Sequence, residues 1–104
     1  MPRKTRDDPT TGFRLIHEPA RLAIMVNLYV ISKADFIQLM NETGLSRGNL
    51  SSHMSKLEEA AYITVTKSFA GKAPRTELAL TRKGREALRE YRRTMEPLIA
   101  GLPK

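Results

Sequence analysis

The sequence predicts a small α+β domain that is mainly α, with a core of three helices, a two-stranded hairpin and a last helix. Three observations support this prediction. Apolar residues recur at helical spacing from residue 19 to residue 60. Residues 62 to 80 are instead rich in β-branched and aromatic residues, with glycine and proline near the middle. A polar segment with regularly spaced apolar residues then continues to residue 104.

Composition and charge restrict the partners of the chain. Its 104 residues suit one domain with a modest core. The net charge of +7 indicates an acidic partner, nucleic acid first and an anionic membrane second. Cysteine is absent, which excludes disulfides, thiolate metal sites and thiol redox sensing. No apolar run approaches the roughly 20 residues of a membrane span, and no signal peptide is recognisable. We therefore expect no membrane partner and a cytoplasmic location.

The chain divides into three parts. Residues 1–12 contain proline, threonine, aspartate and glycine without an apolar period, so we predict a flexible N-terminal arm. Residues 13–83 form the predicted main domain, and residues 84–104 form a C-terminal helix. The dimerisation of the protein is assigned to this last helix.

Two helices are predicted in the first half of the domain. Pro19 suits the first position of a helix, because its missing N–H would be unpaired there, and the apolar period then continues to about Val30. Ser32 with Asp35 three residues later resembles a capping box and predicts that the second helix begins at Ser32. Gly44 suits the left-handed residue that ends this helix.

The third helix has one apolar face and one face without bulky side chains. Ser46 caps it, and we predict that it runs to about Ala60. At about 100° per residue, the apolar residues gather on one side. They are Leu50, Met54, Leu57 and Ala61. The opposite side carries Gly48, Ser51, Ser52, Ser55 and Glu59. A helix of this shape can enter a groove, and we expect that groove to belong to duplex DNA.

Two strands follow, over residues 62–69 and 75–80, joined by a longer loop that contains Gly71 and Pro74. Thr81 is expected to cap the final helix. Pro97 predicts a kink or a stop near Glu96, since a proline inside a helix costs about 3 kcal/mol.

Apolar residues of the final helix are spaced four and three apart, which favours packing against a partner helix. The residues are Gly84, Leu88, Tyr91, Met95, Leu98 and Leu102. We predict a dimer interface formed by Leu88, Tyr91, Met95 and Leu98. Packing of this helix on the first helix of its own domain is the alternative.

A pair of helices joined by Gly-Leu-Ser, with the second helix in a major groove, is the helix-turn-helix arrangement. The residues placed to read bases are Ser46, Arg47, Gly48, Asn49, Ser51, Ser52 and Ser55. Arg47 can form a bidentate pair with guanine, which is worth about 1–3 kcal/mol of discrimination. Asn49 either reads adenine in the same way or bonds locally to the turn. Gly48 either lets the backbone approach DNA closely or is simply tolerated in the first helical turn.

Further residues are predicted to contact the DNA backbone: His53, Lys56, Lys67, Lys72 and Arg75. For His53 we expect a half-buried side chain bonded to backbone or phosphate rather than a metal ligand. Lys56 either contacts phosphate or is solvated. The hairpin cations would lie along flanking backbone or an adjacent minor groove. No catalytic set, metal site or cofactor is expected, because the sequence has no Gly-rich phosphate loop, paired carboxylates or nucleophile–base pair.

The span from Pro19 to Lys83 resembles the winged-helix transcription regulators of the MarR and ArsR type, in particular their short single-domain group. PARLAIM is similar to the first helix of the family's DNA-binding domain. GLSRGNLSSHMSKLEEAAYI is similar to its turn and recognition helix, and GKAPRTELALTRKG to its wing and the lead into the last helix. The metal sites of the ArsR type and the longer dimerisation helices of the MarR type have no counterpart here.

The resemblance implies a winged helix-turn-helix fold and a sequence-specific regulator, most often a repressor, that binds double-stranded DNA as a homodimer. The recognition helix, about 46–60, would lie in the major groove, and the wing, about 62–80, on flanking backbone or minor groove. The sequence neither supports nor excludes a small-molecule effector. The alternative is a winged helix used as a protein–protein interaction module without specific DNA binding. RNA binding is a third option, but the aromatic platforms that stack single-stranded bases are missing.

Overall fold

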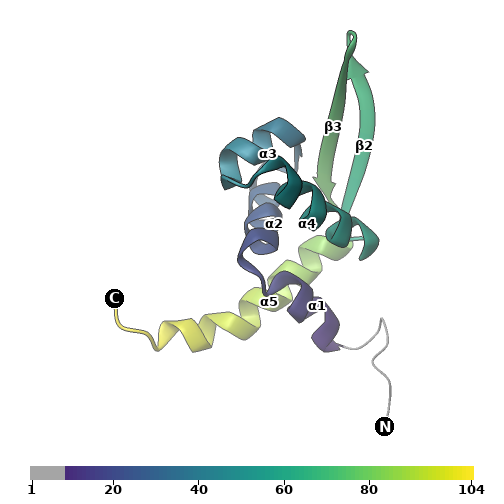
Figure 1. Ribbon diagram of the computed structural model, residues 1–104. Helices are drawn as coiled ribbons and strands as arrows, with labels where there is room; N and C mark the ends of the chain where they lie inside the picture. The colour runs from purple at the N-terminus through teal and green to yellow at the C-terminus, as the bar shows by residue number, and fades with distance from the viewer. Residues whose placement is uncertain (1–8) are drawn as a thin grey trace.

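The structure, a computed structural model, describes residues 9–104, and the order of its elements is apparent in Figure 1. The helices in chain order are α1 (Pro9–Ile16), α2 (Pro19–Ile31), α3 (Phe36–Thr43), α4 (Arg47–Glu59) and α5 (Arg82–Ala100). The strands are β1 (Lys33–Asp35), β2 (Ile63–Ala70) and β3 (Ala73–Leu80). The predicted fold class, a mainly helical α+β domain of the winged helix-turn-helix type, is confirmed.

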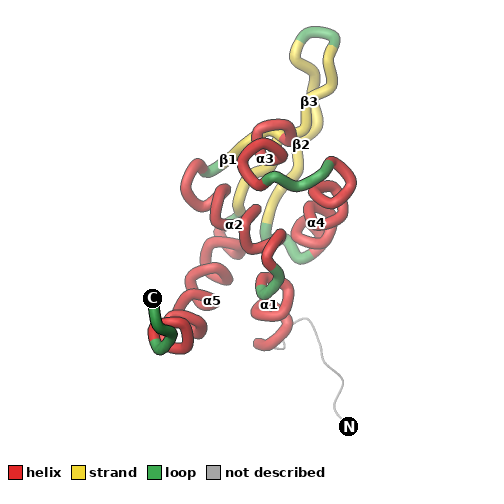
Figure 2. The backbone as a smooth tube through the Cα atoms, turned by 60° about the vertical axis from the view of Figure 1, so that its left-hand side comes forward, coloured by secondary structure: helices red, strands yellow, loops and turns green. Residues whose placement is uncertain are grey.

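The three strands form one antiparallel sheet in the order β1-β3-β2. Strands β2 and β3 pair along their whole length, from Ile63 opposite Leu80 to Ala70 opposite Ala73. We call this hairpin the wing. Its base lies against the helices, and its distal half stands clear of them, as Figures 1 and 2 show.

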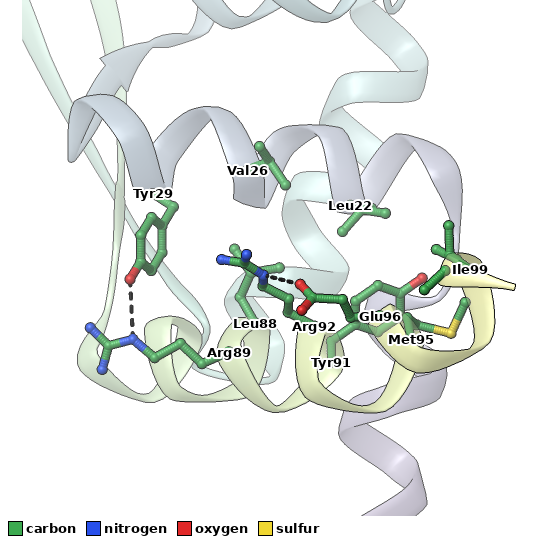
Figure 3. A pocket seen from close by; sticks show the side chains of 11 residues that line it. Leu22, Val26, Tyr29, Leu88, Arg89, Tyr91, Arg92, Met95, Glu96 and Ile99 are labelled. Atoms are coloured by element: carbon green, nitrogen blue, oxygen red, sulfur yellow. Dashed lines mark hydrogen bonds and ion pairs between the residues drawn. The ribbon is translucent and has the colours of Figure 1, made fainter. Parts of the chain in front are cut away.

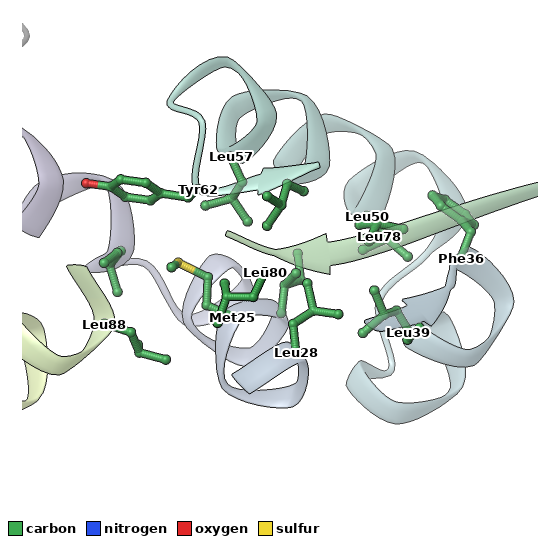
Figure 4. Packing of buried hydrophobic residues seen from close by; sticks show 14 residues of the cluster. Met25, Leu28, Phe36, Leu39, Leu50, Leu57, Tyr62, Leu78, Leu80 and Leu88 are labelled. Carbon is green, nitrogen blue, oxygen red and sulfur yellow. The ribbon is translucent and has the colours of Figure 1, made fainter. Parts of the chain in front are cut away.

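One hydrophobic core joins the helices to the base of the wing (Figure 4). Helix α2 contributes Ile24, Met25 and Leu28, and the wing contributes Ile63, Leu78 and Leu80. Leu50 and Leu57 fix the inner side of α4 to this core and are fully buried. The apolar periods of α2 and α4 therefore have their predicted effect: each helix buries one side and leaves the other exposed.

The turn between α3 and α4 follows the sequence prediction closely. Gly44 ends α3 in the left-handed region, at φ 74°, and its N–H donates to the carbonyl of Met40. Leu45 packs against the core. The Ser46 hydroxyl then caps α4 by accepting from the N–H of Asn49 at 3.2 Å. Short-range capping chemistry thus sets the angle between the two helices.

The predicted start of the second helix at Ser32 is wrong. Ser32 ends α2 with φ 71°, and residues 33–35 form β1 before α3 begins. Asp35 is the cap of α3, and its carboxylate accepts from the N–H of Gln38 at 2.8 Å. Strand β1 forms because it pairs with residues 77–79 of β3. This long-range partner outweighs the local capping pattern.

The predicted N-terminal arm is partly wrong. Residues 9–12 belong to α1, whose last residue, Ile16, is fully buried, and α1 packs against α5. Packing on a helix about 70 residues away in sequence explains why no local pattern indicated it. Residues 1–8 of the predicted arm lie outside the described residues.

Three smaller predictions also differ from the structure. The wing has a two-residue turn, Gly71–Lys72, in place of a longer loop; Gly71 at φ 67° permits this tight turn. Ala61 was expected on the inner face of α4 but follows the helix at φ 62° and is exposed. Helix α5 does not stop near Glu96, because a proline removes one hydrogen bond without preventing helical backbone angles. The kink stays a prediction.

Candidate nucleic-acid interface

The outer face of α4 is exposed to solvent. This holds for every residue predicted to read bases: Ser46, Arg47, Gly48, Asn49, Ser51, Ser52 and Ser55. Leu50 and Leu57 on the opposite side anchor the helix in the core. No described part of the chain covers the outer face, so α4 presents a surface of small and polar groups that a groove can receive.

The polar groups on this face differ in their freedom to bond a ligand. The Ser46 hydroxyl is engaged as the helix cap, and the Ser55 hydroxyl donates to the Ser51 carbonyl at 3.1 Å. The Asn49 side chain makes no hydrogen bond with any described residue; only its backbone N–H serves the cap. Of the two alternatives for Asn49, a side-chain bond to the turn is therefore not observed.

Gly48 has space around it. A Cβ atom built at this position meets no heavy atom within 4 Å. Packing within the subunit therefore does not require glycine here, although glycine in a helix costs about 1 kcal/mol relative to alanine. This open space is compatible with both alternatives for Gly48, close approach of DNA and simple tolerance of glycine in the first helical turn.

Arg47 lies over the ring of Phe36, with its guanidinium carbon 5.6 Å from the ring centroid. Phe36 is buried at the start of α3. The contact holds the Arg47 side chain between α3 and α4 while leaving it exposed. A guanidinium held in this way keeps its five donors available for a base edge or a phosphate.

A concave surface lies between α4, the start of α3 and the inner face of the wing. We call it the α4–wing hollow. Its polar lining comes from the start of α3, from α4 and from the wing: Asp35, Gln38 and Asn41, then Arg47 and Ser51, and lastly Lys67, Arg75 and Thr76. The hollow continues the exposed face of α4 toward the wing. Gln38, Asn41 and Thr76 were not singled out from the sequence, because the start of α3 was misplaced and the register of the wing was unknown.

The wing has two different faces, and its cations are divided between them. Lys67 pairs in register with Thr76, two residues beyond the buried part of the hairpin, and lies in the α4–wing hollow. Arg75 is on the alternate set of residues, where its guanidinium approaches Glu77 at 3.7 Å. Lys72 is exposed in the turn. Lys67 and Arg75 both line the hollow, whereas Lys72 does not, so Lys67 and Arg75 are the wing cations placed for a ligand there.

His53 and Lys56, predicted as backbone contacts, lie away from the hollow. His53 is half-buried, and its Nδ1 is 3.2 Å from Nη1 of Arg21 on α2. A half-buried histidine was expected, but its partner is a side chain of the same chain. The same Arg21 donates from Nε to the Leu15 carbonyl, so it connects α1, α2 and α4. Lys56 is exposed on the side of α4 that borders α1 and Tyr62.

A second surface, an apolar groove, lies between α2 and α5 (Figure 3). Its floor is formed by Leu22, Val26, Leu88, Met95 and Ile99. Polar contacts border it: Arg89 donates to the Tyr29 hydroxyl at 3.1 Å, and Arg92 pairs with Glu96 at 2.7 Å. The bond from Arg89 lowers the pKa of Tyr29, because it stabilises the phenolate.

The apolar seam predicted along α5 lies partly in the core of the chain and partly on its surface. Leu88 is buried in the core of its own chain. The Tyr91 hydroxyl lies 2.9 Å from His17 Nδ1, and its ring lies 5.1 Å from the ring of Phe13 on α1. Leu98 and Leu102, by contrast, are each 67% exposed. Packing within the subunit therefore accounts for the first half of the seam but not for the second.

Among the described residues, no group of three or more histidine or acidic side chains is arranged to hold a metal ion. Nor does any helix in residues 9–104 have the length and apolar character needed to cross a membrane.

Comparisons with known proteins agree with this geometry. Residues 20–99 match the family described as winged helix DNA-binding domain. An uncharacterised protein of Methanocaldococcus jannaschii is 31% identical over 78 residues, covering 75% of this chain and 85% of that relative.

Solved structures extend the likeness to the whole fold. A transcriptional regulator homologue from Pyrococcus horikoshii is similar at a TM-score of 0.80 and 29% identity, over 92% of this chain and 98% of that one. A PadR family transcriptional regulator from Eggerthella lenta gives a TM-score of 0.68 over 90% and 89% of the two chains. Its 19% identity shows the fold alone. With the exposed helix, the wing and the matched span together, the chain belongs to the winged-helix DNA-binding domain family and is a DNA-binding transcriptional regulator.

Proposed function

We propose that this regulator binds a specific double-stranded DNA site as a homodimer and represses transcription by occupying that site. Helix α4 enters the major groove, and the wing lies on flanking backbone or in the next minor groove. The observation that carries this proposal is the exposed outer face of α4, whose side chains are small or polar and which adjoins the α4–wing hollow. The cytoplasm is the compartment in which such a protein would act.

The dimensions suit a duplex. Helix α4 has 13 residues, so it is about 20 Å long, and the major groove is about 12 Å wide. The wing extends five residues past Leu78 to Ala73, which is about 17 Å at the usual rise of a strand. Half a turn of B-DNA is also about 17 Å, so a wing beside α4 can reach the adjacent minor groove.

Direct base reading is assigned to Arg47 and Asn49, supported by Ser51, Ser52 and Ser55. Arg47 has the geometry for guanine, and the unbonded Asn49 amide can pair with adenine. Gln38, Asn41, Lys67, Lys72 and Arg75 would contact phosphates around the hollow and position the helix without reading sequence.

The dimer proposal has support from the apolar surface at the end of α5. Leu98, Ile99 and Leu102 are exposed, and Ile99 also lines the apolar groove between α2 and α5. A second copy that covers this surface removes several large apolar side chains from water at once. Two copies of α4 would then address two half-sites of a palindrome.

The decisive test is a titration of the purified protein against duplex and single-stranded oligonucleotides at two salt concentrations. We expect salt-dependent affinity for the duplex and selection of a preferred sequence from a random duplex pool. A protein–protein module would show neither. Equal or tighter binding of single strands would contradict the proposal.

Arg47→Ala should weaken binding to the selected duplex by about 10-fold or more, since a bidentate contact is worth about 1–3 kcal/mol, with a much smaller effect on random duplex. Lys72→Ala is the matched control. It should weaken all duplexes evenly and reduce the slope of log affinity against log salt by about one. If Arg47→Ala leaves sequence preference unchanged, another residue reads the site.

A further inference from the structure

The distal part of the wing carries an exposed aromatic side chain, Phe69. It is 74% exposed, although the other large apolar residues of the hairpin lie at its base. An isolated exposed apolar residue is common in proteins and by itself indicates nothing. The position of Phe69 relative to the α4–wing hollow gives it meaning.

The strand register places Phe69 on the inner face of the wing. Successive residues alternate between the faces, so the inner face carries Ile63, Val65, Lys67 and then Phe69. Phe69 is opposite Pro74, and the preceding pair is Lys67 opposite Thr76. Lys67, Thr76 and Pro74 line the α4–wing hollow, together with Ala70 and Arg75 of the alternate set. Phe69 is not among the lining residues, but its cross-strand neighbour Pro74 is, so Phe69 lies at the edge of this surface, toward the tip of the wing.

The charges around Phe69 and its distance from the base of the wing indicate which kind of molecule would bind there. Lys67 precedes Phe69 on β2 and Lys72 follows it in the turn, which favours a polyanion next to the aromatic ring. Phe69 and Pro74 are four residues beyond Val65 and Leu78 at the buried base, or about 13 Å. This distance carries the ring across the phosphate backbone that separates the major groove from the adjacent minor groove, since half a turn measures about 17 Å.

We propose that Phe69 is an apolar wedge that enters the minor groove beside the site read by α4 and partly unstacks one base step. Pro74 supports the ring from the opposite strand, and the two lysines hold the flanking phosphates. This inference rests on the proposed function. Pyrimidine–purine steps unstack at least cost, so the wedge adds sequence preference at a position that makes no hydrogen bond to the protein.

The test uses the full chain and the duplex selected from a random pool, with 2-aminopurine placed in turn at each step of the flanking minor groove. Wild-type protein should raise the 2-aminopurine fluorescence at one step, because unstacking relieves quenching. Phe69→Ala should abolish this rise and lower affinity by about tenfold, while the salt slope stays unchanged because no phosphate contact is lost. Phe69→Leu should keep most of both effects, since leucine also acts as a wedge.

Val30→Ala is the matched control. Val30 is 75% exposed but lies on α2, away from the wing, and its truncation should change neither fluorescence nor affinity. Thermal unfolding by circular dichroism verifies that each variant is folded. If Phe69→Ala binds with wild-type affinity and fluorescence, Phe69 serves only the Phe69–Pro74 pair and the wedge is excluded. If wild-type protein binds no duplex at all, the proposed function itself fails.

Discussion

Three glycines of the described residues are in helices, and at two of them, Gly84 and Gly48, the surrounding space predicts opposite effects of alanine. A Cβ atom at Gly84 would lie 2.2 Å from the Tyr62 carbonyl oxygen and 2.9 Å from Leu80 Cδ1. Helix α5 starts here, directly against the backbone of residue 62, and Thr81 bonds that segment through both its N–H and its hydroxyl. Gly84 is therefore a packing requirement, whereas Gly48 faces open space.

We expect Gly84→Ala to lower the free energy of unfolding by about 1–3 kcal/mol, because the backbone at Tyr62 cannot move away cheaply. Gly48→Ala should raise it by up to about 1 kcal/mol through helix propensity. The same Gly48→Ala protein should bind duplex DNA more weakly if close approach is the reason for glycine. Urea unfolding monitored by circular dichroism measures both changes. Equal stability of the two variants would contradict the packing argument at Gly84.

Glu18 gives the fold an acid-sensitive component. Its carboxylate caps α2 by accepting from the N–H of Arg21 at 2.8 Å, and this bond lowers the pKa of Glu18 below its ordinary value of 4.5. A lowered pKa in the folded state contributes stability above about pH 4.5, and this contribution is lost as the pH falls through the folded pKa. Glu18→Gln should therefore flatten the acid limb of stability against pH below about pH 5. An acid limb identical to that of the wild type would exclude this role.

At the scale of the elements, what the sequence predicted depended on local chemistry. The turn from α3 to α4 is set by Gly44, Leu45 and Ser46, which lie within three residues of one another, and it was predicted correctly. The exposed face of α4 likewise follows from its own periodicity. Strand β1 and helix α1 were not predicted, since the first needs β3 and the second needs α5 as a partner.

In the candidate interface too, the features set by local sequence were predicted, and those that need a distant strand or helix were not. All seven predicted base-reading residues are exposed on α4, because their placement needs only a helix and its buried side. The hollow beside them needs the register of β2 with β3, which no local signal specifies. Thr76 and the inner position of Phe69 therefore came only from the structure, as did the inward contact of His53 with Arg21.

For the whole molecule, the end of α5 presents an exposed apolar surface that no part of residues 9–104 covers. The regular spacing along α5 combines residues of the core, such as Leu88, with residues on the surface, such as Leu98 and Leu102. Periodicity cannot separate these two roles, since one helix face can continue from a core onto an interface. A variant that tests the dimer must therefore change surface residues of α5 and leave its core residues intact.

The double variant Leu98→Glu with Leu102→Glu should give a monomer in sedimentation equilibrium without loss of folding, because both side chains are 67% exposed and no core contact is removed. Leu88→Glu should instead unfold the chain, since it places a charge in the core. Val30→Glu is the control for an added charge on an exposed apolar position outside the groove lining. A folded monomer should also lose affinity for a palindromic duplex far more than for a single half-site, because linked binding of two α4 helices is lost. An oligomer that persists in the double variant would place the interface elsewhere on the surface.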